Sequence, residues 1–296
     1  MTPRVLIVGG TRFIGAHVAR QLFDAGAAVT VFHRGRSDNP ILPAVTHIRD
    51  PLAAYPITTF PAALRDADWD IVIDMVMMGA ADALAAVDCF AGRIGRLVMI
   101  SSGDIYRAYG RLTRHEPGPP DQVPLGEDAP LRSVLYPYRS QAAALGAYAH
   151  DYEKILAEKI VREAALPATI LRLPKVYGPE DNSGLATIYG FASQPQWRWT
   201  HGHVANVAAA IVLAATHPAA AGRTYNVGEA ATPTMGERLA RLPARDAAKP
   251  PPPFDYRQHM VVDTSRIRAE LGFTEQVDEE AAMLAQAEKS REERSS

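Results

Sequence analysis

The sequence predicts an α/β protein with a doubly wound parallel β-sheet, followed by a smaller C-terminal region. Short β-rich runs alternate with helical patterns through the first half of the 296-residue chain, the pattern of a parallel sheet with crossover helices. The first run leads directly into glycines and then into a helix. Apolar residues make up 47% of the chain and charged residues 22%, which is an ordinary balance for a globular protein.

The sheet is expected to contain six β-rich runs in the first part of the chain, at residues 4–10, 28–34, 45–50, 70–76, 96–102 and 168–174. One helix is expected after the first glycines and stops at Gly26, and another is expected at 151–165. A polar, proline-rich insertion covers residues 107–141. A loop of this length inside a compact domain is usually functional or disordered.

The composition changes after residue 176, so we expect a first domain at 1–176 and a smaller region at 177–296. Within the second region, residues 203–216 predict an apolar helix, and residues 263–273 predict a capped helix that ends at Gly272. A strand at 224–229 is expected to return to the main sheet, and the proline run at 249–254 predicts a stiff linker.

Charge and cysteine content exclude several classes of protein. A net charge of −2 gives no overall attraction to nucleic acid or anionic membranes. The single cysteine, Cys89, excludes an internal disulfide framework and suits a reducing compartment. No run approaches the ~18 apolar residues of a membrane span, and the apolar run Val5–Val8 predicts a strand rather than a signal peptide. We expect a soluble, cytoplasmic protein.

The segment LIVGGTRFIG, residues 6–15, has the order strand, glycines, helix that a dinucleotide-binding loop of the Rossmann type requires. Glycines permit a tight turn, and they let backbone N–H groups approach a pyrophosphate at the positive end of the helix. The residues expected to contact the dinucleotide here are Gly9, Gly10, Thr11, Arg12, Phe13, Ile14 and Gly15.

Several motifs in order carry a resemblance to a known family. They are VLIVGGTRFIG, MISSGDIY, KILAEKIV, LRLPKVYGP, HVANVAAAI, YNVG and DTSRIRAELGF. Together they resemble the extended short-chain dehydrogenase/reductase superfamily, specifically its NAD-dependent epimerase/dehydratase family, in an atypical form. The resemblance implies a Rossmann-type fold, substrate binding by the C-terminal region, hydride transfer with a nicotinamide cofactor, and a homodimer. The form GGTRFIG also resembles a branch that includes chloroplast RNA-binding proteins.

Arg12 stands where the family has the middle glycine of its loop. A guanidinium at this place suits a bidentate contact with phosphate. The alternative is that Arg12 points to solvent and leaves the backbone to hold the pyrophosphate.

The end of the second strand suggests which cofactor is bound. NAD-preferring relatives have an acidic residue there that binds the ribose 2′-hydroxyl, whereas this chain has His33, with Arg34 and Arg36 beside it. Because cations attract a 2′-phosphate, we expect NADP(H), with NAD(H) as the alternative. Asp50 is at the position where the family contacts adenine.

The family resemblance also implies a catalytic Ser, Tyr and Lys. Ser102 matches the serine, four residues before Tyr106, and Lys154 matches the lysine that also holds the nicotinamide ribose. The tyrosine should be four residues before Lys154, but His150 is there, and Tyr152 lies two residues too late.

Three alternatives follow from this departure. His150 is the acid/base, since its unperturbed pKa suits proton transfer near neutral pH. Tyr152 acts instead if the helix begins at or after it, because two residues in a regular helix point about 200° apart. Otherwise the standard chemistry is lost. Tyr136 and Tyr138 in the insertion are further candidate proton donors.

On the substrate side, Lys175 replaces a frequent asparagine of the family and suits a substrate carboxylate or phosphate. The segment 179–199, which carries many contacts in sugar-nucleotide enzymes, is short. His201 and His203 have no third ligand nearby in sequence, so no metal site is expected.

The leading hypothesis is an NAD(P)-dependent oxidoreductase, epimerase or dehydratase that acts on a small polar metabolite. The alternative is a dinucleotide-binding regulator or RNA-binding protein without redox turnover. Near-neutral charge and the lack of a long basic stripe weigh against nucleic acid.

Overall fold

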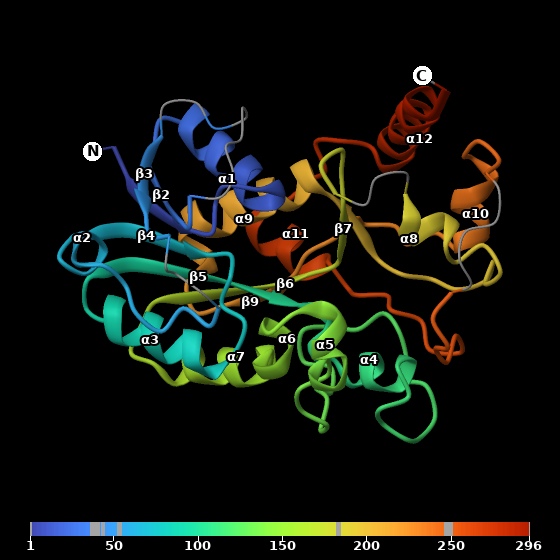
Figure 1. Ribbon diagram of the computed structural model, residues 1–296, viewed down its shortest axis with the longest axis horizontal. Coiled ribbons are helices and arrows are strands. Elements are labelled where there is room, and N and C mark those ends of the chain that lie inside the picture. The colour runs from blue at the N-terminus through green and yellow to red at the C-terminus, as the bar shows by residue number, and fades with distance from the viewer. Residues whose placement is uncertain are drawn as a thin grey trace.

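The computed structural model describes residues 2–35, 42, 45–51, 55–181, 185–245 and 251–295. Its main feature is a seven-stranded, parallel sheet in the order β3-β2-β1-β4-β5-β6-β9 (Figure 1). The strands are β1 (Arg4–Val8), β2 (Ala28–His33), β3 (Thr46–Arg49), β4 (Trp69–Asp74), β5 (Ile94–Ser102), β6 (Ala168–Leu173) and β9 (Thr224–Asn226). This order confirms the predicted doubly wound α/β fold.

Alternate residues of the buried strands face two separate cores. Val5 and Ile7 of β1 pack on one face with the first helix and two later ones, whereas Leu6 and Val8 pack on the other face. The first face is covered by α1 (Phe13–Asp24), α9 (Val204–Thr216) and α11 (Ser265–Leu271), and the second by α2 (Ala62–Arg65), α3 (Ala80–Phe90) and α7 (Lys154–Glu163) (Figure 1). Strands buried on both faces explain the nearly continuous apolar runs in the sequence.

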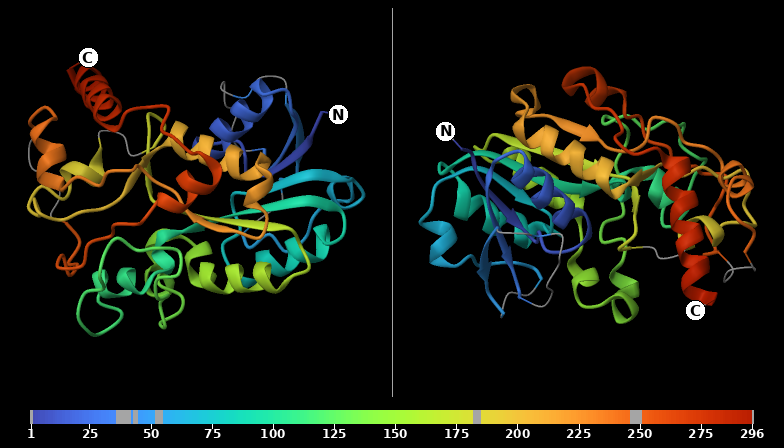
Figure 2. Two further views of the ribbon diagram at one scale, coloured as in Figure 1. Left: turned by 180° about the vertical axis from the view of Figure 1, so that it is seen from behind. Right: turned by 90° about the horizontal axis from the view of Figure 1, so that it is seen from above.

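The predicted return strand is present but shorter than expected. It is β9, and it pairs in parallel with β6 at the edge of the sheet. The remaining C-terminal elements lie together to one side of the sheet (Figures 1 and 2). They are β7 (Lys175–Tyr177), β8 (His201–His203), α8 (Ala186–Tyr189), α10 (Met235–Ala240) and α12 (Glu279–Ser295). The short turn η3 (Pro218–Ala220) lies instead at the amino end of β6, where the Thr169 hydroxyl donates to the Ala220 carbonyl oxygen. β7 and β8 form a separate two-stranded parallel sheet.

The insertion is folded and joins the two parts of the chain. The short turn η1 (Gly103–Ile105) links β5 to the insertion. The insertion begins with α4 (Arg107–Leu112) and ends with η2 (Arg139–Gln141). Two further short helices follow it, α5 (Ala142–Leu145) and α6 (Tyr148–Asp151). An isolated bridge pairs Leu125 of the insertion with Val262 of the C-terminal region, so the insertion closes over the end of the sheet where β5 and β6 stop.

Candidate active site

The glycine loop between β1 and α1 is packed too closely for side chains at two of its glycines. Gly9 has φ +86°, and a β-carbon there would lie 2.4 Å from Cγ1 of Val76. A β-carbon on Gly15 would lie 2.8 Å from both Gly10 Cα and the Gly9 carbonyl oxygen. The loop therefore brings backbone directly against the start of α1, the arrangement that lets a phosphate approach main-chain N–H groups.

The replacement of the family's glycine by Arg12 has a simple steric explanation. Arg12 has φ −136° and ψ 150°, an extended conformation that any residue adopts, and its side chain is exposed. The positive φ of the turn falls one residue later, on Phe13 at +43°. The turn therefore needs no glycine at position 12, and the arginine is placed at the N-cap of α1.

At the end of β2, His33 is buried and paired with a second histidine. Its Nε2 lies 2.9 Å from Nδ1 of His47, and its Nδ1 accepts a hydrogen bond from the Gly35 N–H at 3.1 Å. Arg34 lies with its guanidinium carbon 4.9 Å from the ring centroid of Tyr55. The Asp50 N–H donates to the His33 carbonyl at 3.0 Å, so these three candidates are adjacent, while Arg36 lies outside the described residues.

The segment before Lys154 is not a continuous helix. α6 ends at Asp151, Tyr152 has φ −63° and ψ 114°, and Glu153 caps α7 through a hydrogen bond from the Ile155 N–H. Tyr152 therefore lies outside the helix, and its hydroxyl donates to Oδ2 of Asp104 at 2.9 Å. The Oγ of Ser102 accepts a hydrogen bond from the Asp104 N–H at 3.3 Å, so Tyr152 and Ser102 both contact Asp104.

The same break turns His150 away. Its side chain is 59% exposed and its Nδ1 pairs with Asp151 at 2.8 Å. The structure thus brings Tyr152, and not His150, to Asp104 beside Ser102, because the continuous helix that would have placed His150 at the site does not form.

Lys154 is buried behind this cluster. Its ammonium donates to the carbonyl of Ile100 at 2.9 Å and to that of Met77, and it lies 5.7 Å from the ring centroid of Tyr152. Burial lowers the pKa of Lys154, and the negative charges of Asp104 and Asp74 oppose that effect.

Asp104 is the centre of the cluster, and the sequence interpretation missed it. Its Oδ2 also accepts from the Tyr138 hydroxyl at 2.8 Å, and the Tyr138 hydroxyl contacts that of Tyr109 at 3.0 Å. Its Oδ1 is buried without a hydrogen-bond partner among the described residues. Burial raises the pKa of Asp104. A signal was available, because an acidic residue stands two positions after Ser102 at the end of a buried strand.

The tyrosines of the cluster are held in their protonated form. Burial, and then the negative charge of Asp104, raise the pKa of Tyr152 and that of Tyr138 well above the usual range. Tyr136 is not part of the cluster. Its N–H donates to Glu153 Oε2 at 2.6 Å, and the Arg139 guanidinium carbon lies 3.7 Å from its ring centroid.

A second buried carboxyl, Asp74, lies at the end of β4. Its Oδ1 accepts from the Val76 N–H at 2.9 Å. Burial raises the pKa of Asp74 to about 6, against the opposing charge of Lys154. Asp74 also lay outside the sequence prediction.

A cavity of about 240 Å³ adjoins the cluster. Ser102 and Asp104 line it at the end of β5, Tyr138 lines it from the insertion, and Lys175 and Trp199 line it from the C-terminal side. Of the catalytic candidates, Ser102 therefore faces a space at the carboxyl ends of the strands, where ligands of open α/β sheets bind, and Tyr152 reaches its edge through Asp104.

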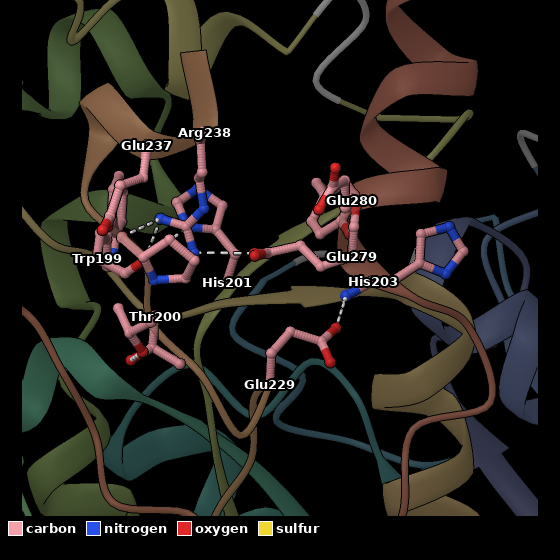
Figure 3. A network of polar contacts seen from close by, with 12 residues as sticks. Trp199, Thr200, His201, His203, Glu229, Glu237, Arg238, Glu279 and Glu280 are labelled. Carbon is pink, nitrogen blue, oxygen red and sulfur yellow. Dashed lines mark hydrogen bonds and ion pairs between the residues drawn. The ribbon is translucent and has the colours of Figure 1, made fainter. Parts of the chain in front are cut away.

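Figure 3 shows the polar network beyond this cavity, around β8. His201 is fully buried with its Nδ1 2.7 Å from the Trp199 carbonyl oxygen, and the His203 N–H donates to Glu229 Oε1 at 2.8 Å. Burial raises the pKa of Glu229 to about 7. Within the described part of the chain, no three His, Cys, Asp or Glu side chains are grouped to hold a metal ion.

Comparison with known proteins identifies the family. The model of the NAD dependent epimerase/dehydratase family matches residues 5–228. The chain belongs to this family. The resemblance to the NAD-dependent epimerase/dehydratase family is thereby confirmed.

Individual relatives are more distant. A UDP-glucose 4-epimerase of Azospirillum brasilense is 27% identical over 213 residues, which is 63% of this chain and 53% of that protein. The chain thus spans about half the length of this curated relative. The structure of the UDP-glucose 4-epimerase of Thermotoga maritima with UDP-glucose superposes with a TM-score of 0.69 at 18% identity. The superposition covers 98% of this chain and 99% of the epimerase chain. The Bordetella bronchiseptica enzyme WbmG, solved with NAD, gives 0.67 at 16% identity over 98% and 95% of the two chains. The two structures establish the fold.

Among the described helices, none is both long enough and apolar enough to cross a lipid bilayer.

Proposed function

We propose that this protein is an NAD(P)-dependent enzyme of the epimerase/dehydratase type that interconverts an alcohol and a carbonyl on a small polar metabolite. The observation that carries the proposal is the cluster of the buried Asp104, Tyr152 and Lys154 with the half-buried Ser102, beside a cavity at the strand ends. Burying a lysine, a carboxylate and the two tyrosine hydroxyls that donate to that carboxylate costs desolvation free energy. A protein that only binds a dinucleotide gains nothing from that cost, whereas an enzyme uses such groups for proton transfer.

The glycine loop fits the cofactor. The close approach of Gly9 and Gly15 leaves the main chain open to a pyrophosphate at the start of α1, and Lys154 would hold the nicotinamide ribose. When bound, the cofactor accepts or donates the hydride.

The protein's own residues handle the proton. In the oxidation direction Ser102 orients the substrate hydroxyl, whose proton passes to Tyr152 Oη. The original Tyr152 proton passes at the same time along its 2.9 Å hydrogen bond to Asp104 Oδ2. This relay is needed because the Asp104 charge disfavours a free tyrosinate. Reduction runs the same transfers in reverse.

The proposed cofactor is NADP(H). Its support is the absence of an acidic residue at the end of β2 and the presence of Arg34 against the Tyr55 ring. We also propose that the enzyme works in the cytoplasm as a homodimer.

Stopped-flow reduction of the bound cofactor by a panel of small hydroxy compounds tests the proposal. The expected result is reduction by the wild type and its loss in Tyr152→Phe and Lys154→Met, with retention in His150→Phe. Tight cofactor binding without transfer to or from any compound in the panel would favour the binding-protein alternative.

A further inference from the structure

The cavity beside the catalytic cluster is small. Its volume of about 240 Å³ lies below the roughly 300–1,000 Å³ of pockets that enclose drug-sized ligands. Ser102 and Asp104 line it at the end of β5, and Lys175, two residues after the Leu173 that pairs with Ser102, lines it together with residues of the C-terminal region. A ligand that reaches Ser102 from this cavity is therefore a small molecule.

Aromatic rings line the cavity on two sides. Tyr109 and Tyr138, with ring centroids 6.2 Å apart, come from the insertion. Trp197 and Trp199, with centroids 5.5 Å apart, come from the segment before β8. The Trp197 Nε1–H donates to the Gln258 carbonyl at 2.8 Å, which fixes its ring. Fixed aromatic walls suit the flat or C–H-rich faces of a ring.

Lys175 is the cation of the cavity. It is partly buried at the start of β7, and no hydrogen bond or ion pair of its ammonium with another described residue is found. Among the described residues that line the cavity, the one other charged side chain is the acidic Asp104. A partly desolvated ammonium is stabilised by an anion that hydrogen-bonds to it.

A second hollow, about 160 Å³ in volume, is lined by residues of α10 and of the start of α12 and does not suit a diphosphate. Asp278, Glu279 and Glu280 line it. Its arginines are already paired, Arg238 with Glu279 at 2.8 Å and Arg241 with Glu280 at 2.9 Å (Figure 3 shows the first pair).

The side chain of Arg238 is also committed elsewhere, since its Nη1 donates to the carbonyls of Trp199 and Pro233, each at 3.1 Å. A nucleoside diphosphate in this hollow would meet carboxylates whose neighbouring arginines are already paired.

We propose that the substrate is a single-ring alcohol or ketone with one anionic group, and not a nucleotide sugar. Its ring lies between the aromatic walls, its anion binds Lys175, and its reacting oxygen reaches Ser102 and Tyr152. This rests on the proposed function. In oxidation the ring carbon loses its hydride to NADP⁺, the hydroxyl proton goes to Tyr152, and a ring ketone is formed.

Calorimetric titration of the NADP⁺-loaded protein tests this without requiring turnover. The probes are 3-hydroxycyclohexane-1-carboxylate, 3-hydroxycyclohexyl phosphate, the neutral 3-(hydroxymethyl)cyclohexanol and UDP-glucose. Both anionic ring compounds are expected to bind more tightly than the other two, and the tighter of them identifies the anion as carboxylate or phosphate. Binding should also change the tryptophan emission, because two of the three tryptophans line the cavity.

Lys175→Met is expected to weaken the anionic probes about 10- to 100-fold, the loss for one hydrogen bond to a charged group, and to leave the neutral diol unchanged. Lys175→Arg should keep most of the affinity. Lys159→Met, at an exposed lysine of α7, is the matched control and should change nothing.

Unchanged binding of the anionic probes by Lys175→Met would overturn the inference, as would tighter binding of UDP-glucose than of either ring compound. Binding of the ring compounds without cofactor reduction would keep the ligand class and contradict the hydride-transfer proposal instead.

Discussion

Replacing Asp104 by asparagine separates catalysis from stability more sharply than any other single change in this site. In the wild type the hydroxyls of Tyr138 and Tyr152 donate to Asp104 Oδ2 at 2.8 and 2.9 Å. The side-chain oxygen of asparagine can accept the same two hydrogen bonds, but it cannot take a proton. Since the relay ends on this carboxylate, oxidation by Asp104→Asn should fall by about 10²–10⁴-fold, the range for loss of a general acid/base group.

The stability of the same variant should rise at neutral pH. Burial raises the pKa of Asp104 in the folded protein above its unfolded value, so the folded state binds this proton more tightly than the unfolded state. The favourable contribution is present at low pH and is lost as pH rises through the folded-state pKa. Asparagine does not ionise, so its variant does not lose this part of the free energy of unfolding as pH rises. The melting temperature at pH 7 should therefore increase.

The assay is the pH profile of kcat for oxidation, measured beside thermal denaturation. In the wild type the rate should fall as pH drops through the pKa of Asp104, because the relay needs the ionised carboxylate. Tyr138→Phe should move this limb to higher pH, since the hydrogen bond from Tyr138 lowers the Asp104 pKa. A variant Asp104→Asn that oxidises at the wild-type rate, or that keeps the same acid limb, would refute the relay.

Three further predictions concern the cofactor loop and the insertion. Arg34→Asp should reverse a preference for NADP(H) over NAD(H) in calorimetric titration, and equal affinities in the wild type would contradict the assignment. Arg12→Gly should weaken cofactor binding about 10- to 100-fold if the guanidinium contacts phosphate, whereas an unchanged dissociation constant would leave Arg12 in solvent. Glu153→Gln should lower the free energy of unfolding by about 3–5 kcal/mol, because it breaks an ion pair with Arg132 whose two side chains are 0% and 1% exposed. Urea denaturation with an unchanged midpoint would show that this pair does not hold the insertion.

The sheet could be predicted from the sequence because its signals are local. Each buried strand is an apolar run, and the glycines mark the turn into α1. The end of an apolar run predicts the end of a strand, and β5 does end at Ser102, as its run predicts. The glycine loop likewise follows the end of β1.

The arrangement around Lys154 could not be predicted in the same way. A helical pattern through 151–165 favours a continuous helix, which would bring His150 to the site. The helix is interrupted because Glu153 caps α7 and pairs with Arg132, 21 residues earlier in the chain. That contact depends on how the insertion folds, and no local spacing reveals it. The roles of Tyr138 and Tyr109 at Asp104 depend on the same packing.

The most direct test of the catalytic assignment is a crystal structure of the wild-type protein with NADP⁺. The catalytic assignment predicts the pyrophosphate at the N–H groups of the Gly9–Gly15 loop. It also predicts the nicotinamide ribose within hydrogen-bond distance of Lys154 Nζ and Tyr152 Oη, and the reactive ring face toward the cavity beside Ser102. A nicotinamide that lies away from Lys154, or a Tyr152 displaced from Ser102 and Asp104 when the cofactor is bound, would contradict it.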